Sequence, residues 1–229
     1  MPRSFQIVCL LISSSIFFSS TRAYSQTKTQ IQNEAPAAVT FTLDFPTSQP
    51  EHYSIRVPSD GSAHYQSSGR LAADPDQTDS FDLDFTVTAE TRQKIFELAA
   101  KAGYFQKDLD SHHKGLAFTG KKTLAYKDAQ RSGESTYNYS PNPAVQDLTS
   151  LMQSLSSTLE FGHRLDYDRQ YQKLALDEEL KRMEEMAHSN QLVEVTAIQP
   201  ILDRIVADQS VINVTRARAQ RLLERASGH

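Results

Sequence analysis

The chain has 229 residues and a formal net charge of −4, with 38% hydrophobic, 9% aromatic and 23% charged residues. This length fits one domain with an appendage or two small domains, and the apolar content is sufficient for a core and unlike that of a disordered chain. The negative charge disfavours binding to nucleic acid or to an acidic membrane surface.

The first 25 residues have the three parts of a secretory signal peptide. Arg3 gives a basic start, the run from Phe5 to Phe18 is short and apolar, and Ala23 and Ser25 are small residues at cleavage spacing. We expect cleavage after Ala23 or Ser25 and export to the periplasm or the extracellular space. Retention as an uncleaved anchor is the alternative.

The chain beyond this segment has neither a cysteine nor a second candidate membrane span. The only cysteine, Cys9, lies within the apolar run, so the exported protein would have no disulfide. Removal of residues 1–25 would leave 22 basic and 28 acidic residues, a charge of about −6. No later segment approaches the roughly 18 apolar residues that suggest a span. Residues 26–38 are polar and without period, which indicates a flexible leader.

Alternation of apolar and polar residues predicts an antiparallel meander. Its four strands are expected at residues 39–45, 51–57, 63–67 and 80–87. Because side chains alternate along a strand, the sheet should have one apolar face and one polar face. Residues 71–79 are expected to form a loop.

That loop contains Asp74, Asp76 and Asp79, whose carboxylates could supply oxygen ligands to Ca²⁺. The segment lacks the glycine and the closing glutamate of an EF-hand loop. An acidic turn is therefore the preferred interpretation.

A helix is predicted directly after the fourth strand, at residues 88–102. Thr88 can cap its first turn, Glu90 suits the helix dipole, and Gly103 can adopt the left-handed conformation that ends many helices. Two further strands are expected at residues 118–126 and 134–139, after a polar connector. The order is therefore four strands, one helix and two strands.

The remainder, residues 141–229, is predicted to be entirely helical. Asn142 and Pro143 give a cap and a first helical residue, and an apolar seam with coiled-coil spacing follows. The seam consists of Val145, Leu148, Met152, Leu155 and Leu159. We expect an interruption at residues 161–163, a solvent-facing helix over residues 165–188, a third helix at 196–208 and a fourth capped by Ser210. The helix that carries the apolar seam should pack on the open face or edge of the sheet.

The fold class predicted by these patterns is α+β: an antiparallel β-sheet meander with one packed helix, followed by a C-terminal all-helical region. The expected organisation is a signal peptide at 1–25, a flexible leader at 26–38, a sheet-plus-helix domain at 39–140 and a helical region at 141–229.

No catalytic, cofactor-binding or metal-binding residue is assigned, and no cofactor is implied. The string Ser111-His112-His113-Lys114 has the Ser-x-x-Lys spacing of penicillin-binding enzymes, but it does not open a helix, and no Lys-Thr-Gly follows. His112 and His113 are adjacent and would point in different directions. We interpret both as surface or hydrogen-bonded histidines.

Two other groups of charged residues could have a function. Asp82 and Asp84 share the polar face of their strand, where exposure to water argues against acid–base chemistry. Arg218, Arg221 and Arg225 share one face of the last helix, and we expect them to pair with the acidic helix around residues 177–185 and not to bind a separate anion.

Four segments carry a resemblance to a known class of proteins. They are LDFP at 43–46, HYSIRV at 52–57, DGSAHYQS at 60–67 and TAETRQKIFELAAKAGYF at 88–105. Over residues 39–160 the chain resembles small exported bacterial proteins of unknown function, in which a meander precedes a helix. The resemblance implies no catalytic residues.

The leading hypothesis is a non-catalytic, exported soluble protein that acts as a binding or interaction module. Its C-terminal helices would bind a protein partner or a second copy of the chain. Two alternatives stay open. One is a hydrolytic enzyme of an unfamiliar family that uses His112, His113 or the Asp82 and Asp84 pair, and the other is an inhibitor of an extracytoplasmic enzyme.

Overall fold

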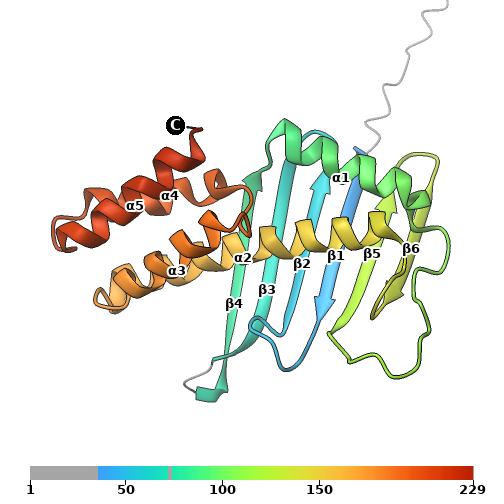
Figure 1. Cartoon of the computed structure of the whole chain (residues 1–229), viewed down its shortest axis with the longest axis horizontal. Helices are drawn as coiled ribbons and strands as arrows, with labels where there is room; N and C mark the ends of the chain where they lie inside the picture. Colours follow the sequence, from blue (N-terminus) through green and yellow to red (C-terminus); the bar gives the residue numbers. More distant parts are fainter. Residues whose placement is uncertain (1–35, 72–73, 229) are drawn as a thin grey trace, which may run out of the picture. The chain divides into compact units, whose positions relative to one another are not determined.

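The structure is a computed structural model that describes residues 36–71 and 74–228, and these belong to one compact unit, Glu34–His229. The expected signal peptide, Cys9 and most of the expected leader lie outside the described residues. The described chain is an antiparallel sheet followed by helices, so the predicted α+β class is confirmed (Figure 1). No helix among the described residues is long and apolar enough to cross a bilayer.

The sheet has six strands in the order β4-β3-β2-β1-β5-β6, and every neighbouring pair is antiparallel. The strands are β1 (Ala38–Asp44), β2 (His52–Pro58), β3 (Ser62–Leu71), β4 (Asp74–Thr86), β5 (Lys121–Lys127) and β6 (Ser132–Tyr137). The first four form the predicted meander. The β5–β6 hairpin then joins the free side of β1, which places the first strand in the interior of the sheet.

The prediction of a loop over residues 71–79 is wrong. Strand β4 already begins at Asp74, and its pairing with β3 includes Gly69 opposite Asp79 and Arg70 opposite Thr78. Backbone hydrogen bonding to β3 therefore holds a polar segment in strand conformation, although its side chains give no apolar alternation.

Helices α1 (Ala89–Lys101) and α2 (Pro143–Tyr171) cross the same face of the sheet (Figure 1). The predicted caps are confirmed: the Thr88 hydroxyl accepts from Thr91 N, and Asn142 Oδ1 accepts from Ala144 N. The apolar seam of α2 is fully buried on the sheet. The opposite face of the sheet has no helix over it in the described chain, as the alternation predicted.

The predicted interruption at residues 161–163 is wrong, because α2 continues through them to Tyr171. Gly162 lies where another segment crosses the helix, and a Cβ atom there would be 2.5 Å from Ile198 Cγ2. The glycine therefore allows close packing between two elements and does not end the helix. The break comes later, between Tyr171 and Leu176.

Four helical segments follow α2. They are α3 (Leu176–His188), the short 3-10 helix η2 (Val195–Ile198), α4 (Gln199–Ala207) and α5 (Asn213–Ala226). The expected solvent-facing helix is instead amphipathic, since α3 buries Leu176, Leu180 and Met183. The last helix is not capped by Ser210, whose hydroxyl bonds Asp208 Oδ1, and it begins only at Asn213.

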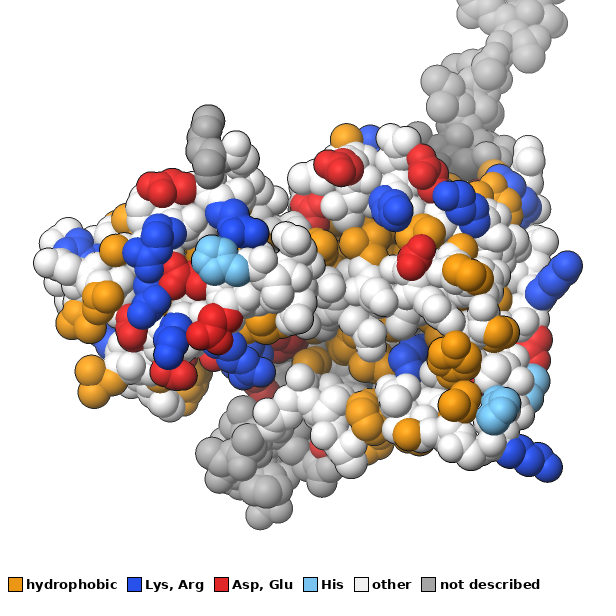
Figure 2. Space-filling view, in the orientation of Figure 1, with side chains coloured by type: hydrophobic (Ala, Val, Ile, Leu, Met, Phe, Trp, Pro, Cys, Tyr) orange, Lys and Arg blue, Asp and Glu red, His pale blue; other side chains and the backbone are white. Residues whose placement is uncertain are grey.

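Two of the three arginines on the basic face of α5 pair with the acidic helix α3, as predicted. Arg218 contacts Asp177 at 3.0 Å and Glu184 at 2.6 Å, and Arg221 contacts Glu184 at 2.8 Å. Arg225 lies 2.9 Å from the His188 ring. The mixed blue and red side chains over these helices in Figure 2 follow from this arrangement, which leaves no separate cationic patch on this face.

A buried carboxylate attaches the helical region to the sheet unit. Glu194, in the segment between α3 and η2, accepts hydrogen bonds from Thr88 N and, at 2.6 Å, from Thr88 Oγ1. It is only 8% exposed. A second attachment lies on α2, where His163 stacks on Phe81 of β4 and its Nε2 is 2.9 Å from Asp79.

Candidate functional site

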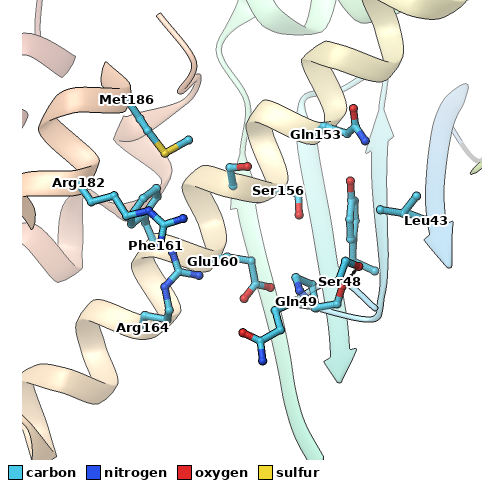
Figure 3. A pocket seen from close by; sticks show the side chains of 13 residues that line it. Leu43, Ser48, Gln49, Gln153, Ser156, Glu160, Phe161, Arg164, Arg182 and Met186 are labelled. Carbon is cyan, nitrogen blue, oxygen red and sulfur yellow. Dashed lines mark hydrogen bonds between the residues drawn. The ribbon is translucent and has the colours of Figure 1, made fainter. Parts of the chain in front are cut away.

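A cleft of about 240 Å³ opens between α2, α3 and the connection from β1 to β2 (Figure 3). Its polar lining includes Gln49, Ser156, Glu160, Arg164 and Arg182. Its apolar lining comprises Leu43, Pro50, Phe161 and Met186, with the ring of Tyr53. The cleft is therefore lined by acidic, basic and apolar side chains.

Glu160 is placed by the helical period of α2. It lies one residue after Leu159 of the buried seam and one turn after Ser156, so both Ser156 and Glu160 are directed towards the sheet. Opposite them, Tyr65 and Ser67 share the inner face of β3, two residues apart. Two periodic elements thus bring a carboxylate and three hydroxyl groups together.

The contacts around Glu160 are short. Its Oε1 accepts a hydrogen bond from Tyr65 Oη at 2.6 Å and another from Ser67 Oγ at 2.7 Å, and Tyr65 Oη also lies 2.9 Å from Ser156 Oγ. Glu160 itself is 9% exposed. Hydrogen bonds from two donors to one oxygen fix the position of a carboxylate that would otherwise be costly to bury.

The tyrosines beside this carboxylate stay protonated. Burial raises the pKa of Tyr65 far above its usual range, and the negative charge of Glu160 raises it further. Burial likewise raises the pKa of Tyr53, which lies on the neighbouring strand with its ring 6.0 Å from that of Tyr65. Both phenols therefore act as neutral hydrogen-bonding groups.

The other side of the cleft is cationic. The Arg164 guanidinium is 4.7 Å from the centre of the Phe161 ring and forms an ion pair with Glu179 of α3. The Arg182 guanidinium is 6.0 Å from the same ring. Among the side chains that the structure describes, Arg182 has no ion pair. In Figure 3 both arginines reach the side of the cleft where Phe161 lies, next to Glu160.

This arrangement is suited to binding. Ser156 Oγ bonds a protonated phenol, so it lacks the adjacent base that would make it a nucleophile. The fixed carboxylate can accept hydrogen bonds from a donor in the cleft, and the Arg182 guanidinium can donate to an anion.

The histidines considered from the sequence lie away from the cleft. His112 and His113 are exposed on the connection between η1 (Gly103–Phe105) and β5, with Lys114 beside them. His112 Nε2 is 2.6 Å from Asp108 Oδ2, and this hydrogen bond raises the pKa of His112. The Ser-x-x-Lys string thus lies in an exposed loop, as the absence of a helix signal predicted.

The two acidic groups considered from the sequence are also outside the cleft. Asp82 and Asp84 are exposed on the open face of β4 and flank His64, at 3.5 and 2.9 Å. Asp79 is hydrogen-bonded to His163, and the side chains of Asp74 and Asp76 lie outside the described residues. Within the described chain no group of three or more His, Cys, Asp or Glu residues could hold a metal ion.

Sequence reasoning missed Glu160 and Arg182. The available signal was an acid at the edge of an apolar seam, where Glu160 follows Leu159 and shares a helix side with Ser156. The partners on β3 lie more than ninety positions earlier in the chain, with separations of 95 for Tyr65 and 93 for Ser67. No local pattern connects residues that far apart.

Comparison with known proteins adds no functional assignment: no protein-family model matches the chain, and no curated protein is significantly similar to it.

Proposed function

We propose that this protein is an exported, non-catalytic binding module and that the cleft beside Glu160 holds its ligand. The observation that carries the proposal is that two unpaired groups of opposite charge line one cleft. One is the largely buried Glu160 carboxylate, held through one oxygen by Tyr65 and Ser67, and the other is the exposed Arg182 guanidinium. A largely buried carboxylate that lacks an opposite charge costs stability, and a cationic group of a ligand recovers that cost. Arg182 is exposed and is therefore accessible to an anionic group of the same ligand.

The non-catalytic part of the proposal rests on where the reactive residue types lie. His112 and His113 are exposed on a loop, and Asp82 and Asp84 are exposed on the polar face of the sheet. None of these four lines the cleft. A hydrolytic enzyme using them would have to act on an open surface, without the enclosed site that excludes water.

The binding function is tested by filling the cleft. Ser157→Phe introduces a ring at a half-buried lining position of α2, and Ser150→Phe introduces the same ring at an exposed position of the same helix as a control. We expect thermal denaturation against a panel of small acids, amines, amino acids and sugars to identify compounds that stabilise the wild type and Ser150→Phe but not Ser157→Phe. A panel that shifts all three proteins equally, or none, would contradict the proposal.

Export is tested separately. If residues 1–25 form a cleaved signal peptide, amino-terminal sequencing of the secreted protein will begin at Tyr24 or Gln26. A chain that begins at Met1 and stays with the membrane fraction would support the uncleaved anchor instead.

A protein-interaction role through the C-terminal helices is the second candidate. Near the end of α2, Tyr167 is 51%, Tyr171 70% and Leu174 93% exposed. Exposed apolar groups of this size are common at interfaces. Light scattering on the wild type and on Leu174→Ser tests self-association, since this substitution removes no buried contact. A monomeric wild type at high concentration would exclude a homodimer.

A further inference from the structure

We propose that the cleft takes a zwitterion of amino-acid size, in which an ammonium group and a carboxylate are joined to a short apolar group. This inference rests on the proposed binding function and names the class of ligand.

The balance of charges in the cleft indicates this class. Three acidic or basic side chains line it, and one of them, Arg164, is already paired with Glu179 of α3. Among the described side chains, neither Glu160 nor Arg182 has an ion pair. One negative and one positive group therefore remain for a ligand, and a single molecule satisfies both only if it carries one charge of each sign.

The negative group is oriented for an ammonium. Tyr65 and Ser67 both donate to the same oxygen of Glu160, Oε1, which fixes the plane of the carboxylate. In Figure 3 the carboxyl group of Glu160 points towards Gln49 and Ser48 of the β1–β2 connection. The Ser48 hydroxyl is hydrogen-bonded to two backbone carbonyl oxygens, Phe45 O at 2.8 Å and Pro50 O at 2.6 Å. The β1–β2 connection is therefore also fixed where it lines the cleft.

The positive group is suited to a carboxylate. A guanidinium presents a planar fork of N–H donors that matches the two oxygens of a carboxylate, and its weak hydration lowers the cost of bringing it to a ligand. Arg182 comes from α3, whereas Glu160 comes from α2. A ligand that contacts both would connect the two helices across the cleft.

The volume sets the size of the ligand. At about 30 Å³ for each water-sized group, a cleft of 240 Å³ has room for about eight such groups. Phe161, Met186 and Leu43 provide an apolar wall for a side chain. Leucine and methionine have suitable size and character for this volume, which is below the roughly 300–1,000 Å³ typical of pockets for drug-sized molecules.

Calorimetric titration with L-leucine and L-methionine tests the proposal, with N-acetyl-L-leucine and L-leucinamide as probes that each lack one charge. We expect the wild type to bind at least one of the two amino acids and to bind each derivative at least tenfold more weakly. Arg182→Met should abolish the preference for leucine over leucinamide, and Glu160→Gln should abolish the preference over the acetylated form. Lys181→Met, an exposed neighbour outside the cleft, is the control and should bind as the wild type does.

The comparison of derivatives on the wild type needs no variant, so it stays decisive if Glu160→Gln fails to fold. Equal binding of either derivative and of leucine, lost in Ser157→Phe, would overturn the zwitterion while the binding function stands. Absence of binding by both amino acids would also overturn the zwitterion. The binding function itself fails only if, in addition, no compound of the wider panel discriminates Ser157→Phe from Ser150→Phe.

Discussion

Replacing Gly162 by alanine tests how closely α2 and η2 pack. An added Cβ would lie 2.5 Å from Ile198 Cγ2, 3.1 Å from Ile198 Cβ and 3.2 Å from Ile201 Cδ1. Ile198 is fully buried, so its side chain has little room to move away. Overpacking of this kind costs about 1–3 kcal/mol. Alanine is favoured over glycine within a helix by about 0.5–1 kcal/mol.

The difference between these two terms predicts that Gly162→Ala lowers the free energy of unfolding by about 1 kcal/mol. Urea denaturation followed by circular dichroism measures it, and the midpoint should fall by about 0.5 M for a slope near 2 kcal/mol per M. The sign is informative, because the same substitution at an uncrowded helix position should stabilise the protein.

A double-mutant cycle with Ile198→Ala isolates the contact. Truncation of Ile198 costs about 2–5 kcal/mol by itself but removes the Cγ2 atom that crowds residue 162. In that background, Gly162→Ala should become neutral or stabilising, with a coupling of about 1–2 kcal/mol. If Gly162→Ala stabilises the wild-type background, the close crossing of α2 and η2 described above is wrong.

Two further predictions concern hydrogen-bonded carboxylates. Glu194→Ala removes the buried carboxylate that accepts from the amide and hydroxyl of Thr88 and should lower the free energy of unfolding by about 1–3 kcal/mol. Glu185→Ala, exposed on α3, should change it by less than about 0.5 kcal/mol in urea denaturation. Asp108→Asn should lower the pKa of His112 in an NMR titration, because the contact with the Asp108 carboxylate raises this pKa in the native protein. Since folding raises the pKa of His112, the contact stabilises the fold at pH values below the ordinary histidine pKa. This stabilisation is lost as the pH rises through the pKa of the folded protein. An unchanged His112 pKa in the variant would mean that the contact is not formed in solution.

The sequence alone was sufficient to predict the features that depend on a short local pattern. Alternation identified the inner faces of the strands, the caps at Thr88 and Asn142 marked two helix starts, and the spacing from Val145 to Leu159 identified the buried side of α2. Each of these depends on neighbours within a few positions, so a local pattern contains the information.

Features that depend on distant partners could not be predicted in this way. Gly162 looked like a helix break because its packing partner, Ile198, lies in another element. The polar start of β4 looked like a loop because backbone pairing with β3, and not side-chain alternation, defines it. The cleft was missed for the same reason, since its carboxylate, its hydroxyl donors and Arg182 come from different elements.

The central position of β1 has a consequence for the order in which the protein can fold. This strand pairs with β2, which follows at once, and also with β5, whose Lys127 lies opposite Ala38. Until β5 and α2 have been synthesised, β1 is an edge strand and only α1 can cover the apolar face of the meander. Non-local pairings of this kind slow folding and leave intermediates prone to aggregation. The segment from β1 to α1, Ala38–Lys101, is therefore the described part of the nascent chain most in need of protection by a chaperone.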